Sequence, residues 1–134
     1  GWFEEVLCEI AGLYALHAVS KECDAELAND LNDVLRDILN DKTYHIDRPL
    51  AEWIDQKQDL LSLDRYFRTH NKTIAIKLAP LFFENPKLWD VVLLIKQIPI
   101  AEEMAFEFFI NAWEALIPPS DSNIFQDFKA MILM

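Results

Sequence analysis

Two glutamates near the start of the chain, Glu5 and Glu9, are spaced one helical turn apart. Side chains four residues apart lie on the same face of a helix. On a projection of 100° per residue, Glu5 and Glu9 share a sector of about 80° with Gly12 and Ser20. Glu4 points roughly opposite to Glu9. Because Gly12 lowers the side-chain wall, this polar strip has room for a ligand, a metal ion or another chain.

A simpler interpretation rests on the helix dipole. Acidic residues in the first turn of a helix stabilise it by roughly 0.3–1 kcal/mol each, and Glu4 and Glu5 lie in that turn. Glu9 would then be a solvated edge of a helix that is otherwise apolar. The pattern alone leaves both interpretations open.

The residues Trp2-Phe3-Glu4-Glu5 resemble the third-ligand helix of the gluzincin zinc metallopeptidases. In that family a His-Glu-x-x-His helix precedes a helix that begins with Trp, a hydrophobic residue, any residue and the zinc-binding Glu. The resemblance implies that Glu5 is the zinc ligand, with Glu4 as the fallback if the register differs by one. It also implies that Glu9, one turn later, hydrogen-bonds a ligand histidine or lines the cleft. Residues 71–89 are similar in style to the helical C-terminal part of such bacterial proteins.

The chain departs from the family because it contains no His-Glu-x-x-His. His17, His45 and His70 lack the spacing of zinc ligands. We therefore expect the catalytic glutamate and both histidine ligands in a missing N-terminal half, so that residues 1–134 are a fragment of a larger protein. The fragment alone is expected to be inactive and without zinc, whereas the parent binds zinc and a peptide substrate. His17 is expected at the edge of the core, and the other two histidines in solvated loops.

A rival hypothesis is a non-catalytic helical interaction domain that has no metal and uses its acidic surface to select a basic partner.

Loss of an N-terminal half would expose the first helix around Glu5, Leu13 and Leu16. An exposed apolar strip tends to be covered, so a homodimer of the fragment is a further expectation. Neither hypothesis indicates a cellular compartment.

The composition supports one packed domain over residues 1–134. Apolar residues make up 52% of the chain and there are only two glycines, which is typical of a mostly helical body. The net charge of −11 argues against nucleic acid as a partner, because affinity for phosphates comes from Lys and Arg. No apolar run reaches the roughly 18 residues of a membrane span. Cys8 and Cys23 are expected to be free thiols, with Cys8 buried.

We expect an all-α fold, an orthogonal bundle of six or seven helices around a central apolar helix at residues 2–20. Asp24 is a plausible N-cap for a second helix that ends near Leu39. In that helix the apolar stripe is formed by Leu27, Leu31, Val34, Leu35 and Ile38. Further along, we expect an interruption at Asn71-Lys72, a kink or break at Pro80, and a helix that runs from Pro99 to about Leu116. Its apolar face includes Phe108.

Overall fold

The computed structural model describes residues 1–64, 68–99 and 104–133. Within these ranges the chain is all-helical, as predicted, and no strand is present. The α-helices are α1 (Trp2–Glu22), α2 (Ala25–Leu39), α3 (Leu50–Leu63), α4 (Arg68–Glu84), α5 (Leu88–Leu93), α6 (Phe106–Glu114) and α7 (Ser122–Ile132). Three short 3₁₀ helices accompany them: η1 (Lys42–Tyr44), η2 (Leu94–Gln97) and η3 (Pro119–Asp121).

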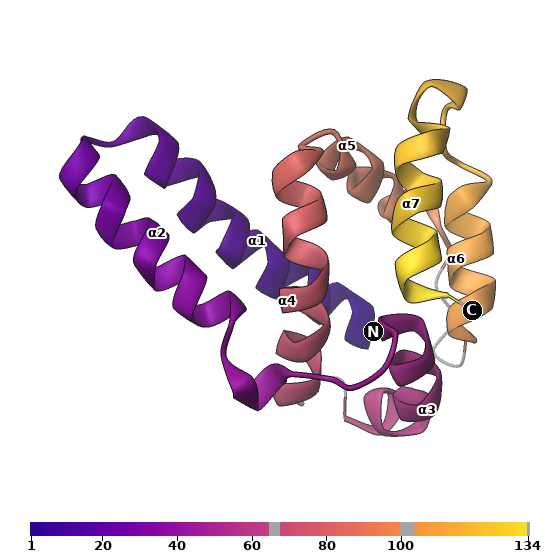
Figure 1. The fold of residues 1–134 in the computed structure, drawn as a ribbon. Coiled ribbons are helices and arrows are strands. Elements are labelled where there is room, and N and C mark those ends of the chain that lie inside the picture. The colour runs from indigo at the N-terminus through magenta and orange to yellow at the C-terminus, as the bar shows by residue number, and fades with distance from the viewer. Residues whose placement is uncertain (65–67, 100–103, 134) are drawn as a thin grey trace.

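Helix α1 is central only over its N-terminal half. Its buried side chains are concentrated there, and they include Phe3, Val6 and Ile10. The C-terminal half leaves the body of the molecule and pairs with α2 as a hairpin, while α4 crosses α1 (Figure 1). The helix was predicted to be central, and it is so over its first half; from its middle onward Ala11, Ala15 and Val19 are exposed.

Helix α2 begins where the sequence predicted. The side chain of Asp24 accepts a hydrogen bond from the backbone N–H of Leu27 at 2.9 Å, which satisfies one of the unpaired donors of the first turn. The predicted apolar stripe is only partly covered: Leu35 is buried, but Leu27 and Val34 are 46% and 48% exposed. The hairpin therefore presents apolar side chains to solvent.

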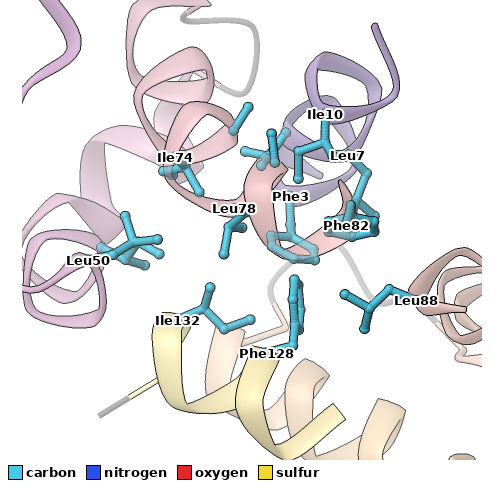
Figure 2. Close-up of a cluster of buried hydrophobic side chains, with 14 of the residues drawn as sticks. Phe3, Leu7, Ile10, Leu50, Ile74, Leu78, Phe82, Leu88, Phe128 and Ile132 are labelled. Carbon is cyan, nitrogen blue, oxygen red and sulfur yellow. The ribbon is translucent and has the colours of Figure 1, made fainter. Parts of the chain in front are cut away.

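The hydrophobic core lies where α1, α3, α4, α5 and α7 converge (Figure 2). Phe3 points into its centre, and its ring lies 6.2 Å from that of Phe128 on α7. Phe82 of α4 and Ile132 of α7 are also almost fully buried. Aromatic rings of this size contribute much of the apolar area that stabilises a small core. The first turn of α1 is thus fixed in position by side chains from distant parts of the chain.

Helices α5, α6 and α7 form a second group of contacts around Trp113. This side chain is 1% exposed, and its Nε1–H donates to the backbone carbonyl of Val91 at 2.9 Å. On the surface beside it, Glu114 accepts hydrogen bonds from Lys129 and Gln126. These bonds hold the pKa of Glu114 below its usual value, mainly through the Lys129 and Gln126 donors.

The interruption predicted at Asn71-Lys72 was wrong, and of the kink or break predicted at Pro80 the break is absent. Helix α4 continues through Asn71-Lys72 and through Pro80. Proline inside a helix costs about 3 kcal/mol, but the side chains on either side of it, Ala79 and Phe82 among them, are fully buried. Packing of this face outweighs the local preference for a break.

The boundary predicted near Pro99 also differs. Helix α6 starts at Phe106, because Ala105 has the extended backbone of an N-cap; residues 100–103 lie outside the described parts. Phe108 is 66% exposed, so it does not belong to the buried face of this helix. Within the described ranges, no helix combines the length and the apolar character needed to cross a membrane.

Candidate site at the start of helix α1

The first of the three acids, Glu4, caps its own helix. The nitrogen of Gly1 donates to Glu4 Oε1 at 3.0 Å, and Glu4 is exposed. A glutamate that reaches back to the residue before the helix satisfies a backbone donor of the first turn. The position of Glu4 is therefore explained by its stabilisation of the first turn of α1, without a ligand.

The second acid, Glu5, has an uncommitted carboxylate. Its side chain is partly buried at the rim of the core, and among the described residues it takes part in no hydrogen bond or ion pair. The neighbouring Trp2, Phe3 and Val6 are buried, so the backbone that carries Glu5 is firmly placed. Within the described ranges, Glu5 is therefore the acid of these three whose carboxylate has no partner.

The third acid, Glu9, is bound to a distant helix. Arg68, the first residue of α4, donates from Nε to Glu9 Oε1 at 3.1 Å. The Glu9 side chain is 26% exposed, whereas that of Arg68 is 78% exposed. The ion pair thus fixes the direction of the Glu9 carboxylate through a side chain that itself lies in solvent.

The rest of the predicted polar strip divides into two environments. Ser20 is buried, and its hydroxyl donates to the carbonyl of His17 at 2.7 Å. Gly12 faces open space, because a Cβ added there would meet no atom within 4 Å. No other described segment packs closely against Gly12, so a larger side chain would fit there. Gly12 therefore does not line a cavity in the described part of the chain.

The expected exposure around Glu5 is also only partly correct. Leu13 is 7% exposed, so it belongs to the core and not to a newly exposed strip. Leu16 is partly buried. The solvent-facing side of α1 is formed instead by small residues, among them Cys8, Ala11 and Ala15. Cys8 was predicted to be buried and is exposed; Cys8 and Cys23 are both free thiols, as expected.

His17 lies at the edge of the core, as predicted. Its ring stacks on that of Phe83, with centroids 4.2 Å apart and planes 8° apart. Its Nε2 is buried without a hydrogen-bond partner. Burial, with a smaller contribution from the nearby Lys21 charge, lowers the pKa of His17. A stacked, partly buried imidazole of this kind is a packing residue.

The two remaining histidines have different environments. His45 is exposed after η1, in line with the prediction of a solvated loop residue. His70 was also predicted in a loop, which was wrong: it lies inside α4 and is partly buried. Its ring meets Trp53 edge-on at 5.6 Å, and burial followed by the charge of Lys57 lowers its pKa. In the parts of the chain that the structure describes, no three His, Cys, Asp or Glu side chains gather as a metal site.

One feature was missed by the sequence analysis: a pocket of about 260 Å³ between the segment after η1 and α3. It is lined by His45, Ile46, Asp47, Arg48, Trp53, Gln56 and Lys57. The signal in the sequence was a segment rich in basic residues. Residues 42–77 contain seven of the twelve Lys and Arg but only five of the 23 acids.

No family model, no curated protein and no solved structure matches the chain.

Proposed function

We propose that this chain is the helical portion of a gluzincin-like zinc peptidase, in which Glu5 is the third protein ligand of the metal. The observation that supports this proposal is the difference between the three acids of α1. Glu4 is used by the helix start and Glu9 by Arg68, whereas the Glu5 carboxylate has no partner among the residues that the structure describes. A ligand supplied by a rigid helix meets the metal with little reorganisation.

The residues present fit one part of such a site. Zinc takes oxygen from Glu and nitrogen from His, with three protein ligands and one open position in catalytic centres. When bound, zinc lowers the pKa of a coordinated water to about 7 and polarises the substrate carbonyl. In this proposal the two histidine ligands and the catalytic glutamate lie outside the 134 residues.

Glu9 has a supporting role in the same proposal. Histidines that bind a metal usually donate their other ring N–H to a carboxylate, which fixes the tautomer and the ring orientation. Glu9 lies one turn from Glu5, and its direction is set by Arg68. The pair Glu9–Arg68 would thus hold a ligand histidine without itself touching the metal.

Zinc analysis of the full-length protein tests the proposal. Metal content measured by mass spectrometry after dialysis against a weak chelator is expected to be one zinc per chain. A full-length sequence without His-Glu-x-x-His, or a purified protein that binds no zinc tightly, would overturn it.

A second candidate function has an observation of its own, the surface of the α1–α2 hairpin. Residues 1–41 contain ten acidic and two basic side chains, a net charge of −8 out of −11 for the chain. Within this acidic surface, Val19, Leu27 and Val34 are each about half exposed. Apolar anchors inside a charged rim are typical of surfaces that bind a helix of opposite charge. In this alternative the chain is a non-catalytic module that binds a basic amphipathic segment.

A further inference from the structure

The pocket between η1 and α3 is open to solvent on one side and has a mixed apolar and charged lining. Its volume of about 260 Å³ is slightly below the range of roughly 300–1,000 Å³ that is usual for sites that hold drug-sized molecules. One wall is apolar and is formed by Trp53, which is buried, and Ile46. The remaining lining is polar or charged. One end of a ligand would therefore contact apolar side chains, and the other end would contact hydrogen-bond donors.

Arg48 is held in place at the edge of this pocket. Its Nε donates to Asp47 at 2.9 Å, and its Nη1 donates to Gln56 Oε1. The Asp47 carboxylate raises the pKa of Arg48, so the guanidinium is always charged. A guanidinium fixed by two neighbours loses little conformational entropy when it binds an anion. The Asp47 charge is neutralised by the same contact.

Lys57 supplies a second positive charge without a partner. It is partly buried on the pocket wall, and among the described residues its ammonium has no hydrogen bond and no ion pair. A positive charge taken partly out of water is costly unless a counter-charge accompanies it. The pKa of the nearby His70 is lowered by burial first and by the charge of Lys57 second.

We infer that this pocket binds a carboxylate attached to an apolar body. Among the Lys, Arg, Asp and Glu side chains, the lining carries two cations, Arg48 and Lys57, and one carboxylate, Asp47, which is already bound. This net charge matches a monoanion better than a phosphate dianion. Arginine forms paired hydrogen bonds to a carboxylate, and Trp53 with Ile46 covers the apolar part of the ligand. The inference does not depend on the zinc proposal, because none of these residues belongs to the α1 site.

Titration of the 134-residue protein, followed by ¹H–¹⁵N NMR, tests the inference. The probes are N-acetyl-leucine, its neutral amide and inorganic phosphate. We expect N-acetyl-leucine to shift the Trp53 indole and the amides of residues 45–48, and the neutral amide to shift them much less. Equal shifts with acid and amide, or shifts with phosphate alone, would overturn the inference.

Two variants and one control complete the test. Lys57→Gln and Arg48→Gln should each weaken binding of N-acetyl-leucine about tenfold, as expected for the loss of one charge-assisted contact. Lys77→Gln, an exposed lysine elsewhere on α4, should leave binding unchanged. Unchanged affinity in both pocket variants, with native-like spectra, would contradict the inference. A tripeptide that ends in Leu distinguishes the source: tighter binding than N-acetyl-leucine assigns the site to peptide termini, and weaker binding assigns it to free acids.

Discussion

Arg68 and Glu9 join the first residue of α4 to the second turn of α1 over 3.1 Å, although 59 residues separate them in the sequence. Exposed ion pairs contribute roughly 0–1 kcal/mol, and Arg68 is largely exposed. The contact therefore contributes little to the stability of the fold. It sets the direction of a carboxylate one turn from Glu5.

This relationship gives a prediction for Glu9. Glu9→Gln should change the free energy of unfolding by less than about 1 kcal/mol. In the full-length protein it should weaken zinc binding about 10- to 100-fold, the usual effect of removing a group that orients a ligand. Urea denaturation and competition with a zinc chelator measure the two quantities. Asp33→Asn, which removes an exposed acid that pairs with Arg36, is the matched control. Unchanged zinc affinity in Glu9→Gln would remove Glu9 from the site.

Trp113 should be among the most sensitive positions of the fold. Trp113→Phe leaves a cavity and removes the 2.9 Å hydrogen bond to the Val91 carbonyl, which keeps its second donor, the backbone N–H of Leu94. The two effects together should lower the free energy of unfolding by about 2–3 kcal/mol. Phe108→Leu, at an exposed aromatic residue on the same helix, should change it by less than about 0.5 kcal/mol. Equal effects of the two substitutions would show that the packing around α6 is not as described.

The lowered pKa values of His17 and His70 predict a fall in stability at mildly acid pH. Because burial lowers the pKa of both in the folded state, the unfolded chain binds more protons below its histidine pKa of about 6.5. The contribution of the two neutral histidines to the free energy of unfolding is thus fully present above about pH 6.5. It is lost as the pH falls through the pKa values that they have in the folded state. Asp41, Asp47 and Glu114 have lowered pKa values, so their contribution is lost only below about pH 4.

Thermal unfolding between pH 7.5 and 5 measures this effect. His17→Phe keeps the stacked ring on Phe83 and removes the buried Nε2 that has no partner, so it should reduce the fall in stability. The exposed His45, changed to Gln, serves as the control. A His17→Phe variant with the same pH profile as the unmodified chain would contradict the assignment.

The hairpin alternative predicts selective binding of a basic helix. A synthetic amphipathic peptide with lysines on its polar face should bind more tightly than the same peptide with glutamates. Added salt should weaken the binding by screening the charges. Leu27→Gln combined with Val34→Gln should reduce it several-fold, since the anchors of such a surface carry much of the energy, and should leave stability nearly unchanged. Fluorescence anisotropy decides: unaltered binding by the double variant would indicate non-specific attraction between charges.

The sequence predicted the class of the fold because helical periodicity and caps are local signals. Asp24 started α2 as expected, and no strand interrupts the described ranges. The errors occurred where tertiary packing overrides local preference. Pro80 lies in a continuous helix because buried residues on either side hold the chain.

The candidate site was predictable only in part. Periodicity placed Glu5 and Glu9 on one face, but it could not show that Glu4 caps the helix or that Arg68 reaches Glu9 from another helix. The pocket beside Trp53 escaped prediction for the same reason, since its lining comes from a loop and a helix whose approach depends on the fold. The exposure of Cys8 and Phe108 likewise depends on which neighbours are present.

Zinc binding by two glutamate variants of the full-length protein tests whether Glu5 is a ligand of the metal. Glu5→Gln and Glu4→Gln remove one charge each from the same helical turn, so they affect the helix dipole alike. Our account predicts that Glu5→Gln abolishes tight zinc binding while Glu4→Gln retains one zinc per chain. Retention of zinc by Glu5→Gln with the affinity of the unmodified protein would contradict the assignment.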